Sequence, residues 1–177
     1  MKYGGIEFDP GTARELLLVA DETAVPAVCS ILEDLGPGVR GVAFLEVPVS
    51  GDVTALAGGV APPNLEVVWL PRDGAELGSL LDREVRRHLG VGQGPASVPD
   101  TEVDPDLWET PDYSSSGEDV DTPVAPVGHD LDGLYAWIAG ESKVVTGLRR
   151  LLVSELDMDR RQVAFMGYWR RGVAMRS

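Results

Sequence analysis

Glu15 to Gly36 read ELLLVADETAVPAVCSILEDLG, and this stretch decides the fold because it joins a strand pattern directly to a helix pattern. Glu15 to Ala20 is apolar after its first residue, which is typical of a strand covered on both faces. Thr23 is the expected N-cap of the following helix, and Pro26 suits its first turn. Apolar side chains then recur at helical spacing until Gly36, at Val25, Val28, Cys29, Leu32 and Leu35.

The rest of the chain repeats this alternation of strand and helix. The predicted strands are Val39 to Val47, Leu65 to Leu70, Leu134 to Ala139 and Gln162 to Gly167, and the predicted helices are Leu77 to Leu89 and Glu141 to about Leu156. The link from Pro48 to Asn64 is rich in glycine, proline and alanine, and its sequence leaves open whether it contains a helix. We therefore expect an α/β fold, a three-layer sandwich of about five parallel strands with helices on both faces.

Residues Val91 to Val127 differ from their flanks. They are rich in proline, serine and acidic residues and poor in aliphatic side chains. Such a composition buries too little apolar surface to offset the entropy cost of ordering. With 177 residues in total, the sequence predicts one domain over residues 1–177 that carries an irregular acidic insertion, anchored at most by Trp108 and Tyr113.

The formal net charge is −14, from 15 Lys and Arg against 29 Asp and Glu. This balance disfavours binding to nucleic acid and to anionic membranes, because both require a basic face. The only cysteine, Cys29, has no partner for an internal disulfide, which suits a reducing compartment. Met1 to Pro10 does not resemble a signal peptide, and no apolar run is long enough to span a bilayer. We expect a cytoplasmic protein with no nucleic-acid and no membrane partner.

The C-terminal end has the opposite charge pattern from the rest of the chain. Lys143 to Ser177 holds eight of the 15 basic residues, whereas no Lys or Arg occurs between His88 and Lys143. These side chains form either a solvated surface or a patch for an anionic ligand or partner. Arg170 and Arg171, which follow the last predicted strand, are the candidates for such docking.

The carboxyl ends of the strands are where open parallel sheets bind ligands, and here they carry no familiar motif. The sequence has no G-x-G-x-x-G after the first strand, no P-loop, no H-E-x-x-H and no paired C-x-x-C, so we expect no metal site. His88, near a helix C-terminus, and Cys29, on an apolar helix face, are interpreted as structural residues. His129 lies beside Asp130, but no nucleophile motif accompanies the pair.

Three segments, in this order, resemble the C-terminal domain of the siderophore-interacting protein family. They are LLLVADETAVPAVCSILE (Leu16 to Glu33), YAWIAGESKVVTGLRRLL (Tyr135 to Leu152) and GYWRRG (Gly167 to Gly172). FLEVP (Phe44 to Pro48) and WLPRDG (Trp69 to Gly74) are similar to weaker family blocks. The resemblance implies a Rossmann-like, ferredoxin-reductase-like nucleotide-binding domain that covers nearly the whole chain outside the insertion.

Members of this family resemble flavoproteins in which a β-barrel holds FAD and the C-terminal domain receives NAD(P)H. Electrons then pass through the flavin to the ferric iron of a siderophore. The fourteen residues before Glu15 are too few for the barrel, and the family's R-x-Y-T flavin motif does not occur. We therefore expect NAD(P)H as the cofactor of this chain, with FAD and access to the ferric siderophore supplied by a separate flavin-domain partner.

The resemblance also implies which residues contact the cofactor. Asp21, Glu22 and Thr23 lie where the phosphates of the dinucleotide pass, and Thr23 together with the helix amides is the better match to an anion. Glu46 is placed like the acidic residue that accepts ribose hydroxyls in NAD sites. Arg72 is placed to meet a 2′-phosphate instead.

On the flavin side, the resemblance implies four further contacts. Gly140 and Glu141 lie where the nicotinamide approaches the flavin, and Tyr168 and Trp169 lie where an aromatic side chain covers the isoalloxazine ring. Each of these residues also has a plain structural interpretation, such as an aromatic side chain that fills the edge of the sheet.

Two functions remain open from the sequence. The first is an NAD(P)H-binding module of a ferric-siderophore reductase, completed by a separate flavin domain. The second is a non-enzymatic binding or regulatory domain that keeps the fold without redox activity. The acidic turn and the missing barrel favour the second function, whereas the intact A-G-E and Y-W-R-R-G elements favour the first.

Overall fold

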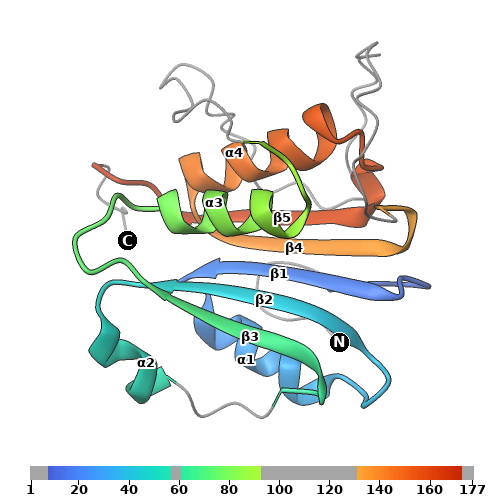
Figure 1. Cartoon of the computed structure of the whole chain (residues 1–177), viewed down its shortest axis with the longest axis horizontal. Helices are drawn as coiled ribbons and strands as arrows, with labels where there is room; N and C mark the ends of the chain where they lie inside the picture. Colours follow the sequence, from blue (N-terminus) through green and yellow to red (C-terminus); the bar gives the residue numbers. More distant parts are fainter. Residues whose placement is uncertain (1–7, 57–60, 93–130, 173–177) are drawn as a thin grey trace.

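The computed structural model describes residues 8–56, 61–92 and 131–172, and it shows a five-stranded parallel sheet with helices on both faces (Figure 1). The strands are β1 (Glu15–Asp21), β2 (Arg40–Val47), β3 (Asn64–Pro71), β4 (Leu134–Glu141) and β5 (Val163–Trp169). Their order across the sheet is β3-β2-β1-β4-β5, and every neighbouring pair is parallel. The predicted α/β class and parallel sheet are confirmed.

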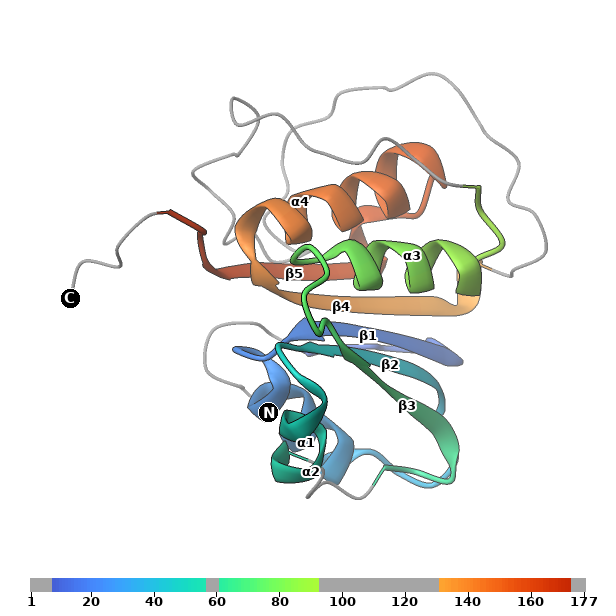
Figure 2. The same cartoon turned by 60° about the vertical axis from the view of Figure 1, so that its left-hand side comes forward.

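Helices cover the sheet on both faces. They are α1 (Val25–Asp34), α2 (Ser50–Leu56), α3 (Ser79–His88) and α4 (Ser142–Arg150), with shorter turns η3 (Leu131–Gly133), η4 (Leu151–Glu155) and η5 (Arg160–Gln162). Figure 2 shows α1 and α2 together on one face and α3 and α4 together on the other. The arrangement gives the three layers that the sequence predicts.

β1 lies in the centre of the sheet, because it pairs with β2 on one side and with β4 on the other. Its residues Leu16 to Ala20 are at most 2% exposed. Successive side chains of a strand point to opposite faces, so Leu17 and Val19 join the core under α3 and α4, while Leu16 and Leu18 join the core over α1. Burial on both faces explains why the run is apolar throughout.

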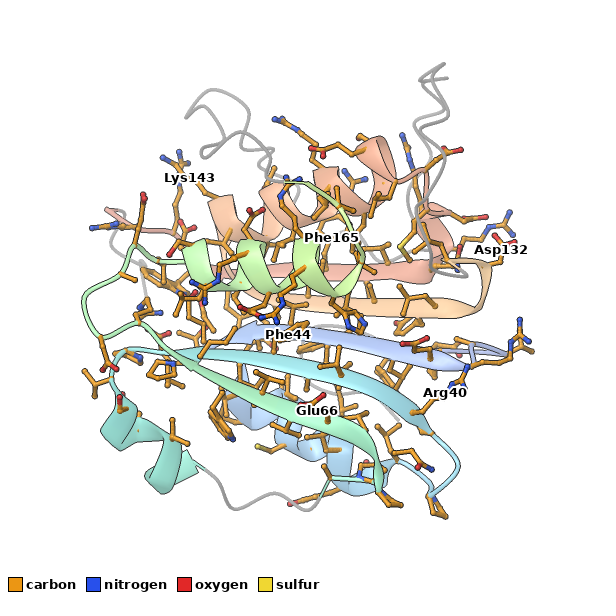
Figure 3. All side chains as sticks on the ribbon, in the orientation of Figure 1. Arg40, Phe44, Glu66, Asp132, Lys143 and Phe165 are labelled. Atoms are coloured by element: carbon orange, nitrogen blue, oxygen red, sulfur yellow. The ribbon has the colours of Figure 1, made fainter. Side chains whose placement is uncertain are left out.

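The strand order reverses at β1. From β1 the chain moves outward through β2 to β3, and it then returns to place β4 and β5 on the opposite side. The reversal lies between the carboxyl ends of β1 and β4, where open α/β sheets bind their ligands. Lys143, at the start of α4, lies at this carboxyl edge in Figure 3, whereas Arg40 and Asp132 lie at the opposite edge.

The first helix differs from its prediction in two respects. Thr23 is not its N-cap, because α1 starts after Ala24 without a side-chain cap and the Thr23 hydroxyl donates to Asp21 instead. Pro26 lies in the first turn, as predicted. Cys29, predicted on the buried face, is only half-buried, since the inward face is formed by Val25, Val28, Ile31 and Leu32.

The link between β2 and β3 contains α2, which the sequence left open. Asp73, which follows β3, caps this helix: the Ser50 hydroxyl donates to Oδ2, and the Ser50 backbone N–H donates to Oδ1 at 3.0 Å. These hydrogen bonds, with the hydroxyl contributing most, hold the pKa of Asp73 below its ordinary value. The predicted helix from Glu141 to Leu156 is divided, because α4 ends at Arg150 and continues as η4, a wider π-helical turn.

Most of the predicted insertion at Val91 to Val127 lies outside the described residues, as do its possible anchors Trp108 and Tyr113. His129 lies outside them as well. These interpretations therefore stay predictions. Among the described helices, none is both long enough and apolar enough to cross a membrane.

Candidate functional site

Asp21 is the last residue of β1, and its side chain lies where the ends of β1, β4 and β5 meet; it is 2% exposed. Its Oδ1 accepts hydrogen bonds from the Thr23 backbone N–H, at 2.9 Å, and from the Thr23 hydroxyl. Its Oδ2 accepts from the Glu141 backbone N–H at 2.8 Å and from the Trp169 indole Nε1–H at 2.9 Å. Asp21 thus joins the β1–α1 turn to the ends of both β4 and β5.

Because Gly140 has no side chain, the Asp21 carboxylate can lie directly against it. Its φ is +153°, and a Cβ at this position would lie 2.6 Å from Asp21 Oδ2. Both the backbone conformation and the close approach therefore require glycine. A bulge between Gly140 and Glu141 shifts the register so that Glu141 pairs with Trp169. The bulge re-aims the end of β5 and brings Trp169 within reach of Asp21.

Glu141 caps α4 and also holds the segment that follows β5. Its Oε2 accepts from the backbone N–H groups of Lys143, at 2.9 Å, and Val144, at 3.1 Å. Its Oε1 accepts from the Arg171 backbone N–H at 3.1 Å. The side chain is buried, and a carboxylate is well suited to this position because the amides at a helix N-terminus lack intrahelical partners.

Glu46, near the end of β2, does the same for α3. It is fully buried, and its Oε1 accepts from Arg72 Nη1 at 3.0 Å and from the Gly78 backbone N–H at 2.7 Å. Its Oε2 accepts from the Leu81 backbone N–H at 3.3 Å. Gly78 is the N-cap residue of α3. At the start of both α3 and α4, backbone N–H groups therefore donate to a buried carboxylate.

Arg72 connects Glu46 to the β1–α1 turn. Its Nη1 and Nη2 donate to the two carboxylate oxygens of Glu22 at 3.0 and 2.9 Å. Burial alone would raise the pKa of Glu22, but hydrogen bonds and the positive charge of Arg72 outweigh it and hold the pKa below 4.5. The Glu22 hydrogen bond is the main cause of a raised Arg72 pKa, despite the opposing effect of burial. Both groups therefore remain ionised at neutral pH.

The aromatic residues that end β5 have different surroundings. Tyr168 is half-buried and packs against the core on the α1 face; burial, and then the negative charge of Asp21, raise the pKa of its phenol. Trp169 is half-buried, and its backbone carbonyl accepts a hydrogen bond from the Ser142 hydroxyl at 3.0 Å. Arg170 is half-buried and Arg171 is exposed, directly after the strand.

The predicted site residues thus form two networks. The first lies at the reversal of the strand order and contains Asp21, Thr23, Gly140, Glu141 and Trp169. The second lies toward β3 and contains Glu22, Glu46 and Arg72. Tyr168, Arg170 and Arg171 flank the first network along the chain.

Sequence reasoning missed two participants, Gly78 and Ser142. Gly78 has a φ of +81°, and a Cβ there would lie 2.4 Å from Val144 Cγ2, so its absence lets α3 approach α4. The available signal was a glycine in the first turn of the helix predicted over Leu77 to Leu89, which in the structure starts after it, at Ser79. No local pattern identified Ser142, because its partner Trp169 is 27 residues away.

The start of α1 differs from the starts of α3 and α4. Buried carboxylates accept hydrogen bonds from the first backbone N–H groups of α3 and α4, whereas no side chain among the described residues caps α1. A helix N-terminus carries partial positive charge and unpaired N–H donors, which suit a phosphate. At this edge of the sheet, an anion is therefore better accommodated at α1 than at α3 or α4.

Among the residues that the structure describes, no metal-ligand cluster accompanies these networks. Within residues 8–56, 61–92 and 131–172, no group of three or more His, Cys, Asp or Glu side chains is arranged to hold a metal ion. His88 ends α3, away from this edge, with Nε2 3.8 Å from Glu15 Oε1 and its ring edge-on to Phe44.

Three comparisons relate this chain to known proteins. A family model described as siderophore-interacting protein matches residues 13–172. Ferric vibriobactin reductase ViuB from Vibrio cholerae is 23% identical over 156 residues, which cover 88% of this chain and 43% of that protein. A siderophore utilization protein from T. fusca is 26% identical with a TM-score of 0.56, and the match covers 94% of this chain and 49% of that one.

A siderophore-interacting protein from Acinetobacter baumannii shares the fold, with 18% identity and a TM-score of 0.59 over 93% of this chain and 49% of that one. The chain thus spans about half the length of the relatives that it matches.

Proposed function

This chain belongs to the siderophore-interacting protein family, and from that premise we propose that it is the NAD(P)H-binding module of a ferric-siderophore reductase. The dinucleotide binds at the carboxyl edge of the sheet, across the reversal between β1 and β4. When bound, NAD(P)H supplies a hydride, whose electrons reach ferric iron through a flavin. The FAD is held outside residues 1–177, on the same polypeptide or on a separate partner. The names of the relatives support the ferric iron of a siderophore as the final acceptor.

One observation carries this proposal: α1 starts at the reversal of the strand order with no side-chain cap from the part of the chain that the structure describes, while α3 and α4 are already capped by Glu46 and Glu141. Ligands of open α/β sheets bind at such a reversal, and phosphates bind at helix N-termini. Arg72, which binds both carboxylate oxygens of Glu22, offsets the negative charge of Glu22 in the β1–α1 turn. The pyrophosphate therefore has one favourable position, at the first turn of α1.

Different residues of the chain contact different parts of the dinucleotide. The backbone N–H groups that open α1 hold the phosphates, since both donors of Thr23 already bind Asp21. Arg72, 13% exposed and paired with Glu22 and Glu46, is the proposed cation for a 2′-phosphate. Gly140, Glu141, Tyr168 and Trp169 form the nicotinamide end of the site. Glu46 supports Arg72 and α3, since its two oxygens already accept three hydrogen bonds. Its direct contact with a ribose hydroxyl stays a prediction.

Calorimetric titration of the purified chain with NADPH and with NADH tests the proposal. We expect saturable binding of at least one nucleotide. Pro26→Glu adds a carboxylate to the first turn of α1, which suits the helix but repels a phosphate, so it should weaken binding about tenfold or more. Ser30→Glu adds the same charge at an exposed position farther along α1 and should leave the affinity nearly unchanged.

Absence of binding by both nucleotides would overturn the proposal and leave the alternative of a non-enzymatic binding or regulatory domain. If Pro26→Glu and Ser30→Glu weaken binding equally, the phosphates lie elsewhere and their assignment to the first turn of α1 is wrong. We further propose a cytoplasmic location, where NAD(P)H is available and the lone Cys29 stays reduced.

A further inference from the structure

The backbone that carries Trp169 is fixed independently of its side chain. The Trp169 carbonyl accepts from the Ser142 hydroxyl at 3.0 Å, and the Arg171 N–H donates to Glu141 Oε1 at 3.1 Å. The register at the bulge pairs Trp169 with Glu141. These contacts place the end of β5, but they leave the indole free to rotate about its side-chain torsions.

The indole itself is held by Asp21. An indole has a single hydrogen-bond donor, and that donor, Nε1–H, lies 2.9 Å from Asp21 Oδ2. A charged acceptor makes this bond stronger than one between neutral groups. Asp21 is itself buried and hydrogen-bonded: it is 2% exposed, its Oδ1 accepts from Thr23, and Gly140 lies against its carboxylate.

We propose that Asp21 is the positioning residue for Trp169, fixing the indole at the nicotinamide end of the site without itself touching the dinucleotide. This inference rests on the proposed function. The same carboxylate accepts from Thr23, in the turn assigned to the phosphates, so it links the two ends of the site through one buried group. Loss of the carboxylate releases the indole and the turn together.

The negative charge of Asp21 makes it possible to distinguish a positioning role from a simple effect of charge on nucleotide binding. NADPH and NADH are anions, so removing a negative charge nearby should by itself tighten their binding, most strongly at low salt. If Asp21 positions Trp169, loss of the carboxylate should instead weaken nucleotide binding. Asp21→Asn keeps the shape of the side chain, but an amide NH₂ replaces one of the two carboxylate oxygens. An NH₂ group is a donor, so it cannot accept the hydrogen bonds that this oxygen accepts in the wild type. We therefore expect binding of the tighter nucleotide to weaken about tenfold despite the lost charge.

Glu22→Gln is the control for the loss of charge: it removes the same charge one residue away, and its side chain bonds to Arg72 rather than to Trp169, so this variant should bind nucleotide more tightly than the wild type. The ¹⁵N-labelled indole N–H of Trp169 is the structural readout in the ligand-free chain. Its resonance should shift and its hydrogen exchange should accelerate in Asp21→Asn, and both should stay as in the wild type in Glu22→Gln.

Trp169→Phe keeps an aromatic ring but removes the donor, and it leaves the other hydrogen bonds of Asp21 in place. It should weaken nucleotide binding, and Asp21→Asn should add little to it, because two residues that act as a unit are non-additive. This variant also decides the question if Asp21→Asn does not fold, since a Trp169→Phe protein with unchanged affinity would overturn the positioning role.

The inference is wrong if Asp21→Asn binds nucleotide as tightly as Glu22→Gln, or if its effect adds fully to that of Trp169→Phe. A wild-type chain that binds neither nucleotide would instead overturn the proposed function, and the positioning role with it. The two failures are therefore told apart by whether the wild type or only the variants depart from expectation.

Discussion

Arg72 and Glu46 form an ion pair that is buried at Glu46 and partly buried at Arg72, with Arg72 Nη1 3.0 Å from Glu46 Oε1 and side-chain exposures of 13% and 0%. The same Glu46 carboxylate accepts the backbone N–H groups of Gly78 and Leu81 at the start of α3. One side chain thus holds both the guanidinium that pairs with the β1–α1 turn and the helix that packs beside α4.

Glu46→Gln should destabilise the fold by about 3 kcal/mol, because it removes one partner of a buried charge and weakens the cap of α3. Urea unfolding followed by circular dichroism measures the change. Glu66→Gln removes the same charge from an exposed position of β3 and should alter the unfolding free energy by less than about 0.5 kcal/mol. Equal effects of the two substitutions would show that Glu46 is not a structural anchor.

Gly140→Ala should destabilise the protein by about 2 kcal/mol or more, because the new Cβ meets Asp21 Oδ2 and the φ of +153° suits glycine alone. Gly36→Ala is the control: a Cβ there has no neighbour within 4 Å, and its φ does not require glycine. Thermal unfolding compares the two variants. A Gly140→Ala protein as stable as Gly36→Ala would contradict the close approach of Asp21.

The Glu22–Arg72 pair should make stability depend on acid pH. The folded-state pKa of Glu22 lies below 4.5, so the unfolded state takes up its proton first as the pH falls. The stabilisation is therefore present above the unfolded pKa and is lost as the pH falls through the folded one. Stability measured from about pH 7 to about pH 3 should decline less steeply in Glu22→Gln than in the wild type. Parallel curves would mean that the pair contributes nothing.

Arg170→Ala/Arg171→Ala should weaken NAD(P)H binding more at low salt than at moderate salt, because exposed charges act over about 8–10 Å. The backbone N–H of residue 171 is retained, so its bond to Glu141 survives the substitution. Stability should change by less than about 1 kcal/mol. If the variant loses stability but binds as before, the two arginines are structural and their docking role is withdrawn.

The sheet and the edge that carries the site follow from local patterns. The apolar run Leu16 to Ala20 predicts a strand buried on both faces, and the strand–helix alternation predicts a parallel sheet. Once β1 is recognised as a parallel strand, Asp21 must lie at the carboxyl edge, where ligands bind. These steps need only the period of the hydrophobic pattern and the topology rules.

The roles of the individual side chains required the structure. Thr23 looked like a helix cap, but it donates to Asp21, which also binds Trp169, 148 positions along the chain. The cap of α2 comes from Asp73, 23 residues after Ser50. A short stretch of sequence cannot reveal hydrogen-bond partners that lie this far apart along the chain. The carboxylates of Asp21, Glu46 and Glu141 accept hydrogen bonds within the protein that the sequence did not predict, and their contacts with a cofactor stay predictions.

Chemical-shift mapping of the ¹⁵N-labelled chain during titration with NADPH and NADH tests the central claim most directly, because it locates the bound dinucleotide without any substitution. We predict saturable shifts of the backbone amides of Thr23, Ala24, Val25, Ala27 and Val28, of Gly140 and Glu141, and of the Trp169 indole N–H, with α2 unaffected. No saturable shift with either nucleotide, or shifts confined to residues away from the ends of β1 and β4, would contradict the claim.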